Sequence, residues 1–272
     1  MNSRPRITLA ASSSVFSGVG LHSGADASVC LRPAAPGVGL VFRDTASGQE
    51  IPALAVNVCD TSRCTRLSYG GVEVQTVEHV LSALAGAGVD DALIEVTGGE
   101  LPAGDGSAAP FIALIRSVGL QKHLGVIVNP LILTQPVTVS QGDATLVALP
   151  SEHFRATVVL DYPRHAYLGT LAAVLDCDDY DADIAPARTF GFLSEIEALR
   201  ANGLGLGASR ENAIVLGEDA YETPLRFPNE LARHKLLDLI GDLALIGRPL
   251  LAHVFALKPS HTLNARLARL LS

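Results

Sequence analysis

Strands and helices are predicted in the same order in the two halves of the 272-residue chain, and this repeat constrains the fold more than any other feature. Alternating apolar and polar residues indicate strands, whereas apolar residues three and four positions apart indicate amphipathic helices. The sequence therefore predicts an α+β protein built from two similar layered domains, residues 1–123 and 124–272, with the boundary near 121–125. The first half has predicted strands at 25–34, 38–44 and 92–98, a hairpin at 64–76, and helices at 76–88 and 105–120; the second has strands within 130–150, at 154–163, 211–217 and 250–260, and helices within 187–207 and at 227–247 and 261–272.

The helix predicted at 76–88 has recognisable signals at both ends. Thr76 precedes the first apolar residue of the helical pattern and is the predicted N-cap, because its hydroxyl can accept a hydrogen bond from a free N–H of the first turn. Gly86 or Gly88 is the predicted end, because glycine tolerates the left-handed backbone that commonly follows a helix.

Composition excludes several classes of protein. The net charge of −8 argues against general nucleic-acid binding, which requires clustered Lys and Arg. No CxxC pair occurs, so the four cysteines, Cys30, Cys59, Cys64 and Cys177, are interpreted as reduced thiols of a cytoplasmic protein. We expect no signal peptide, because the N-terminal residues lack a sustained apolar region. We expect no transmembrane segment, because no apolar run is long enough for a span.

Glu78 and His79 form the first candidate site, at the start of the helix predicted at 76–88. Adjacent helical side chains diverge by about 100°, so the two can act on one site only where they converge at the helix start. The pair alone fits equally a surface glutamate beside a hydrogen-bonded, partly buried histidine.

His234 and Asp238 form a second candidate, four residues apart on one face of the helix predicted at 227–247, and Asp242 extends the row by one turn. This spacing lets an imidazole and a carboxylate reach one ion. An ordinary polar stripe is the alternative, although the leucines and isoleucine around these residues favour a cleft or an internal site.

His261 follows a predicted strand, where a histidine can act as an acid or base or can simply cap the next helix. Two histidines and a carboxylate with an open position make a common catalytic metal site. Spacing alone does not show that His79 meets His234, so the residues support a metal-hydrolase hypothesis and no more. The remaining histidines, interpreted as ordinary structural or surface residues, are His22, His123, His153, His165 and His253.

The chain also resembles the UDP-3-O-acyl-N-acetylglucosamine deacetylases, the zinc enzymes of bacterial lipid A synthesis. No single matching motif is long, but their order and spacing over nearly the whole chain are specific. The motifs are SGVGLHSG at 17–24, LRPA at 31–34, TVEHVLSALAGAGVDDALIEV at 76–96, DGSAAPF at 105–111, ARTFGF at 187–192, NAIV at 212–215, RHKLLDLIGDL at 233–243 and SHTLN at 260–264.

The resemblance implies a role for each candidate residue. His79, His234 and Asp238 would bind Zn²⁺, and Glu78 would be the general base that activates water. His261 would stabilise the oxyanion or protonate the leaving amine, Asp242 would orient His261 and keep it charged, and Thr189 would donate a hydrogen bond to the tetrahedral oxygen.

The resemblance further implies two β-α-β layered domains whose helices face each other, with insertions at about 57–74 and 189–216. The second insertion would form an apolar passage for the acyl chain of the small-molecule substrate, UDP-3-O-acyl-N-acetylglucosamine. Lys235 would lie near the sugar diphosphate, and a monomer is expected. The residues expected to line the passage are Phe190, Phe192, Ile196, Leu199, Leu204 and Ala213.

Two other functions remain open at this point. One is a non-catalytic protein of the same fold that binds a sugar nucleotide or an acyl chain, although a binder has no need of Glu78, Asp242 and His261 together. The other is a zinc deacetylase that acts on a different N-acetylated sugar. Turnover of the zinc-loaded protein on a panel of substrates separates the three functions.

Overall fold

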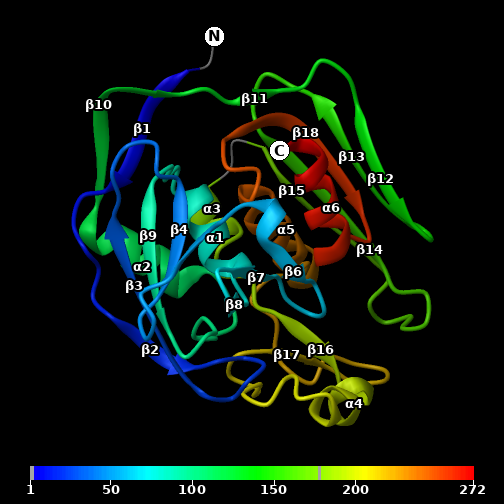
Figure 1. Cartoon of the computed structure of the whole chain (residues 1–272). Coiled ribbons are helices and arrows are strands. Elements are labelled where there is room, and N and C mark those ends of the chain that lie inside the picture. The colour runs from blue at the N-terminus through cyan, green and yellow to red at the C-terminus, as the bar shows by residue number, and fades with distance from the viewer. Residues whose placement is uncertain (1–2, 177–178) are drawn as a thin grey trace.

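The computed structural model describes residues 3–176 and 179–272 and confirms the α+β class (Figure 1). Cys177 lies outside the described residues, and Cys30, Cys59 and Cys64 are free thiols. In the described part of the chain, no helix combines the length and apolarity that a membrane crossing requires.

The first large sheet has the strand order β2-β3-β9-β4-β5. The pairs β2–β3, β3–β9 and β4–β5 are antiparallel, whereas β4 and β9 are parallel. The last strand in sequence therefore lies at the centre of the sheet, between two hairpin-like pairs. Its strands are β2 (Phe16–Val19), β3 (Asp26–Pro33), β4 (Leu40–Asp44), β5 (Glu50–Pro52) and β9 (Ala92–Thr97).

The second large sheet repeats this pattern as β12-β13-β18-β14-β15. Again the last strand in sequence is central, and it is parallel to one neighbour, β14, and antiparallel to the other, β13. The two halves thus share one strand order and one set of strand directions. The strands are β12 (Val137–Gln141), β13 (Ala144–Pro150), β14 (Arg155–Asp161), β15 (Thr170–Leu175) and β18 (Leu250–Leu257), and β11 (Leu131–Ile132) also pairs with β18.

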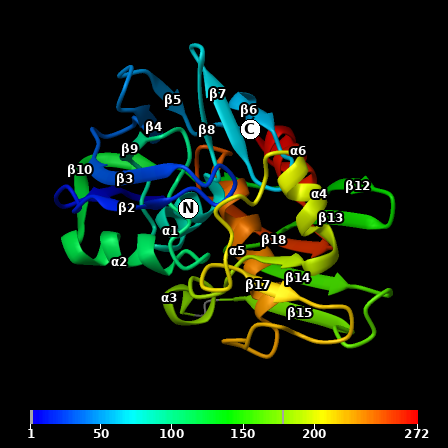
Figure 2. The ribbon, with the colours of Figure 1, turned by 90° about the horizontal axis from the view of Figure 1, so that it is seen from below.

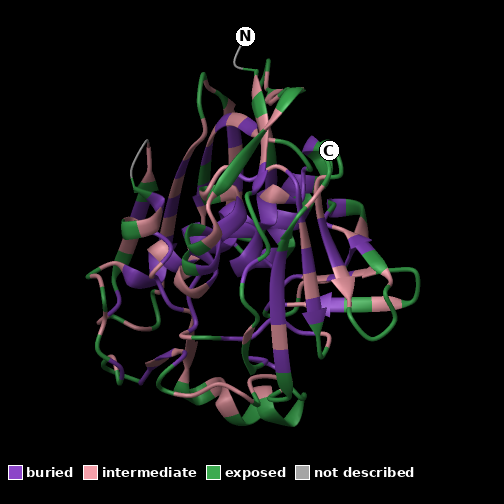
Figure 3. Cartoon of the chain, turned by 90° about the vertical axis from the view of Figure 1, so that its left-hand side faces the viewer, coloured by how far each residue is buried: buried purple, intermediate pink, exposed green. Residues whose placement is uncertain are grey.

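Helices α1 (Glu78–Gly86) and α5 (Glu230–Ala244) pack against each other between the two sheets (Figures 1 and 2). Buried residues gather on these helices and on the strands beside them, whereas loops and outer edges are exposed (Figure 3). Each half has one further long helix: α2 (Ala109–Val118) contacts α1, and α6 (His261–Leu271) contacts α5.

Gly241 sets how closely α5 approaches α1. A Cβ atom at this position would overlap the backbone carbonyl of Glu78. Glycine within a helix costs about 1 kcal/mol relative to alanine, and here its missing side chain allows direct contact between the helices. The contact brings the start of α1 beside the middle of α5, where Asp238 and Asp242 lie.

The remaining strands form smaller sheets outside the two large ones. Strands β6 (Val58–Asp60), β7 (Arg66–Tyr69) and β8 (Val72–Gln75) form one, with the predicted turn at Gly70-Gly71. Parallel strands β16 (Phe190–Phe192) and β17 (Ile214–Leu216) form another, beside α4 (Ile196–Ala201) at the lower edge of Figure 1. The expected boundary at 121–125 falls within β10 (Leu120–Val128), which pairs with β1 (Arg4–Leu9); the two domain ranges stay predictions.

The predicted N-cap of α1 was wrong. Thr76 has a left-handed backbone, with φ of 59°, the helix begins at Glu78, and its N-cap residue is Val77. The Thr76 hydroxyl instead donates to Glu100 Oε1 at 2.9 Å. Sequence also missed α3 (Tyr180–Asp183) and the strands β1, β2, β5, β6, β10 and β15. The helix expected within 187–207 is confined to α4 and the 3₁₀ turn before it.

A buried ion pair joins the start of α5 to the segment before β16. Glu230 accepts hydrogen bonds from the backbone N–H of Arg188 and Arg226, and from Arg188 Nε at 2.8 Å. Burial favours the neutral acid, but these donors and the Arg188 charge outweigh it and lower the pKa of Glu230. The pair therefore fixes the Ala187–Thr189 backbone against α5.

We predict that Glu230→Gln lowers the free energy of unfolding by about 3–5 kcal/mol at neutral pH, because the Arg188 charge is left buried without a counterion. The folded-state pKa of Glu230 is depressed, so its contribution is present above the unfolded pKa and is lost as the pH falls through the folded value. Urea unfolding at several pH values should show the deficit shrinking in acid. Glu222→Gln, which breaks the exposed pair with Arg210, is the control and should cost under about 1 kcal/mol; equal losses would contradict the prediction.

Candidate metal centre and active site

The turn before α1 holds Glu78 and His79 in the interior. Glu100 accepts the Thr76 hydroxyl and the backbone N–H groups of His22 and Ser23, so one buried carboxylate ties the start of α1 to the 20–23 loop. Glu78 and His79 are only 3% and 5% exposed. Two polar side chains at the first positions of a buried helix require specific partners there.

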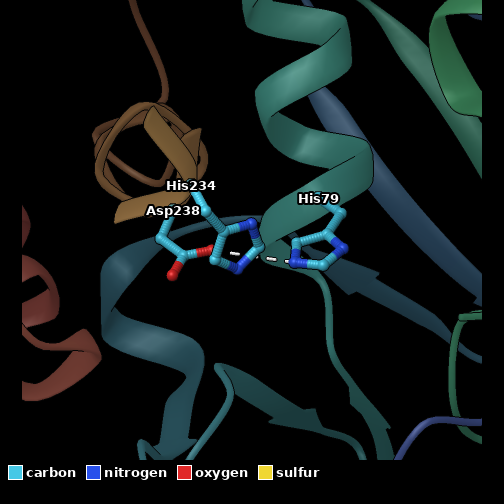
Figure 4. A group of neighbouring side chains, drawn as sticks. All are labelled: His79, His234 and Asp238. Carbon is cyan, nitrogen blue, oxygen red and sulfur yellow. Dashed lines mark ion pairs between the residues drawn. The ribbon is translucent and has the colours of Figure 1, made fainter. Parts of the chain in front are cut away.

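His234 and Asp238 project from α5 toward His79 (Figure 4). The backbone carbonyl of Ala187 lies 3.1 Å from His234 Nδ1, so Nδ1–H donates to it and Nε2 keeps a free lone pair. His234 Nε2 and His79 Nε2 lie 3.4 and 3.7 Å from Asp238 Oδ1. One ligand atom from each of the three residues lies within 4.8 Å of the other two.

The donor set fits a divalent metal ion. Asp238 Oδ1 is buried and has no hydrogen-bond partner among the described residues. The other oxygen, Oδ2, accepts from Lys235 Nζ at 2.7 Å, so only Oδ1 remains free for an ion. Buried polar atoms are rarely left unpaired, and two imidazole nitrogens with one carboxylate oxygen form a common catalytic metal site.

The charge states of these groups suit metal binding as well. Burial lowers the pKa of His79 to about 4 and that of His234 to about 3, so both imidazoles are neutral near pH 7 and offer lone pairs. For Asp238, burial favours the neutral acid. Attraction to His234, which is itself protonated at the low pH where Asp238 titrates, and to the Lys235 ammonium outweighs it and holds the pKa of Asp238 far below its ordinary value.

A second cluster lies beside the first. His261 Nδ1 donates to Asp242 Oδ2 at 3.0 Å, and Asn264 Nδ2 donates to the same oxygen at 2.9 Å. Burial opposes a charged imidazole, but Asp242 and Glu78 outweigh it and raise the pKa of His261 to about 9. His261 Nε2 then faces Glu78 Oε1 at 3.9 Å and Asp238 Oδ2 at 3.8 Å.

Glu78 completes this arrangement as a carboxyl group that can exchange a proton near neutral pH. Burial raises its pKa to about 7, against the lowering effect of the nearby His261. Its Oε2 accepts the Thr65 backbone N–H at 3.0 Å, and its Oε1 is the atom nearer His261. Neutral imidazoles, a titratable carboxyl and a cationic imidazole therefore surround one small space.

The residues predicted for the acyl passage are mostly brought together. A cavity of about 310 Å³ is lined by Thr189 and by residues of the second predicted insertion. Phe192 is absent from its lining and packs against Tyr162 and His165, with ring centres 5.6 and 4.5 Å away. Lys235 is also absent and binds Asp238. The predicted residues that do line the cavity are Phe190, Ile196, Leu199, Leu204 and Ala213.

Three residues of the site escaped the sequence analysis. Thr65 donates its hydroxyl to Asp242 Oδ1 at 2.5 Å, and its place in a hairpin gives no signal of this. Asn264 follows His261 by three residues on α6, so the shared helical face could have revealed it. His22, interpreted as an ordinary histidine, is buried in the wall of the 310 Å³ cavity.

The fold and the site together define an α+β protein with a buried His₂Asp cluster suited to a divalent metal and with acid–base groups beside it. The family model described as UDP-3-O-acyl N-acetylglycosamine deacetylase matches residues 6–272, and the chain belongs to this family.

Curated relatives carry the same description. The UDP-3-O-acyl-N-acetylglucosamine deacetylase of Myxococcus xanthus is 46% identical over 258 residues, which cover 93% of this chain and 82% of the relative. The protein of that name from Chlamydia muridarum is 43% identical, over 93% of this chain and 90% of the relative. The protein of that name from Citrifermentans bemidjiense is 41% identical, over 93% of this chain and 84% of the relative.

We predict that the purified protein binds about one divalent metal ion per chain and that His79→Ala or His234→Ala abolishes tight binding, since each removes one ligand of three. Elemental analysis after gel filtration measures the metal content. His253→Ala is the matched control, because His253 lies on β18 and contacts Thr157 instead of the cluster. Full metal content in both ligand variants would contradict the assignment.

Proposed function

We propose that the chain is a zinc-dependent hydrolase that removes the N-acetyl group from UDP-3-O-acyl-N-acetylglucosamine in lipid A biosynthesis. The observation that carries the proposal is the convergence of His79, His234 and Asp238 beside Glu78 and His261, in a chain of this deacetylase family. Two imidazoles, one carboxylate and a neighbouring carboxyl base are the groups that metal-assisted amide hydrolysis requires.

A bound Zn²⁺ would lower the pKa of a water ligand to about 7 and polarise the amide carbonyl. Glu78 accepts a proton from the attacking water, for which its pKa of about 7 is well matched. Carbon–oxygen bond formation creates a negatively charged oxygen, and cleavage of the carbon–nitrogen bond then releases acetate and the sugar amine. The proton on Glu78 or on His261 passes to the departing nitrogen.

His261 and Thr189 supply the hydrogen-bond donors for the developing oxyanion in this proposal. Asp242 accepts from His261 Nδ1, so the ring presents a protonated Nε2 toward Glu78 and Asp238. Thr65 and Asn264 donate to Asp242 and hold its carboxylate in place. Because His261, Asp242, Thr65 and Asn264 are buried, the His261 donor acts in a medium of low polarity, where it stabilises charge more strongly than in water.

The substrate is proposed to lie with its acyl chain in the 310 Å³ cavity. Phe190, Leu199 and Leu204 give this cavity an apolar wall, and Thr189 lines it as well. Lys235 is proposed to face the sugar diphosphate from the other side of Phe190, whose ring centre lies 5.4 Å from Lys235 Nζ. In this proposal Phe190 separates the apolar acyl chain from the polar head group.

We predict that Glu78→Gln lowers kcat for deacetylation by at least about 10²-fold, because the amide cannot accept the proton of the attacking water. Metal content should stay at the wild-type level, since Glu78 is not a proposed ligand. Acetate release from the acylated UDP-sugar by the zinc-loaded variant measures the effect.

The matched control for Glu78→Gln is Glu73→Gln, on β8, where the exposed glutamate pairs with Arg66. This variant should retain wild-type turnover. Unchanged kcat in Glu78→Gln would refute the assigned base, whereas substrate binding without any turnover by the wild-type protein would refute the deacetylase function itself.

A further inference from the structure

A second and larger cavity lies between the two halves, away from the proposed metal centre. Its volume is about 580 Å³, within the range of about 300–1,000 Å³ that small-molecule sites occupy. None of the proposed metal ligands or catalytic residues lines it. Its wall is largely apolar and includes Leu40, Leu54, Val89, Phe154, Leu243 and Leu250.

The last turns of α1 and α5 form part of this wall. Ala85 and Gly86 come from α1, and Leu243 and Ala244 come from α5. With a rise of 1.5 Å per residue, Ala85 and Ala244 lie roughly 9 Å along their helices from His79 and Asp238. The cavity is therefore separate from the metal centre, but it shares the two helices that carry the ligands.

The apolar wall offers few polar groups to a ligand. Tyr180 lines the cavity, but its hydroxyl already bonds to Ser82 Oγ at 2.7 Å. The backbone carbonyl of Ala85 near the end of α1 accepts a hydrogen bond from Gly88 N–H, and that of Ala244 at the end of α5 accepts one from Gly247 N–H. A sugar or nucleotide would find little to bond with here, whereas an aliphatic chain would replace water along the wall.

Three arginines and one carboxylate, Asp90, supply the charged part of the lining. Arg4 and Arg6 are paired with Asp90 and Asp91, at 2.6 and 2.7 Å. Arg248, an exposed residue next to the end of α5, has no hydrogen-bond or ion-pair partner within the described residues 3–176 and 179–272. One free guanidinium beside an apolar cavity is complementary to a ligand with a single anionic head and an apolar tail.

We propose that this interdomain cavity is a second ligand site, which binds a single-chain aliphatic carboxylate with its tail against α1 and α5 and its carboxylate on Arg248. The site is independent of the metal and of the deacetylation chemistry. Because the occupant contacts both halves, its binding should also raise the melting temperature of the protein.

Dodecanoate, below its micellar concentration, is the probe for a test by native mass spectrometry and calorimetry. The 310 Å³ cavity is expected to bind one molecule as well, so the test uses Ala213→Trp to fill that cavity first. This variant should still bind one dodecanoate, and adding Arg248→Glu should weaken that binding at least about tenfold, since a charge-assisted hydrogen bond is lost. Dodecanol should bind the Ala213→Trp protein more weakly than dodecanoate does.

A second variant tests the apolar wall without changing charge. Ala244→Trp narrows the 580 Å³ cavity and should abolish the same binding event. In the wild-type background, Ala244→Trp should reduce the stoichiometry from two dodecanoates to one, and Arg248→Glu should weaken one of the two binding events at least about tenfold. These variants keep the test valid if Ala213→Trp does not fold. Arg164→Glu, which does not line this cavity, is the charge control. Dodecanoate binding unchanged by both Arg248→Glu and Ala244→Trp would overturn the proposal.

Discussion

The close contact between α1 and α5 is the constraint on which the rest of the site depends. Gly241 leaves room for the carbonyl of Glu78, so the first turn of α1 lies directly against the middle of α5. His79 and Glu78 come from one half of the chain, and His234, Asp238 and Asp242 come from the other. In each half one such helix comes immediately before the central strand of the sheet in sequence, so a site formed between the helices uses residues from both halves.

Burial has opposite consequences for neighbouring groups in this site. It keeps His79 and His234 neutral, which leaves lone pairs for a metal, and it raises the pKa of Glu78 into the range of a general base. His261 escapes the same effect because Asp242 bonds directly to its ring and Glu78 lies close by. Similar residue types in one small volume thus reach different charge states through their nearest partners, and the proposed chemistry requires that difference.

Sequence periodicity predicted the α+β class, the long helix that carries His234 and Asp238, and the end of α1 near Gly86, because these depend on local pattern. The start of α1 was missed because Thr76 bonds to Glu100, a partner 24 residues away, instead of to its own helix. Spacing could place His234 beside Asp238 but could not bring His79 to them, since that contact depends on packing between the halves. The resemblance supplied that grouping. The hydrogen bond from Thr65 to Asp242 and the place of His22 in the cavity lining had no sequence signal, because both depend on how separate segments pack together.

The central claim is that one metal ion is bound jointly by a histidine of the first half and a histidine and an aspartate of the second. A crystal structure of the metal-loaded protein, with anomalous scattering measured at the zinc edge, tests this most directly. The account predicts a single strong peak within about 2.0–2.2 Å of Nε2 of His79, Nε2 of His234 and Oδ1 of Asp238. A peak that lacks any one of these three ligands, or that lies elsewhere in the protein, would contradict it.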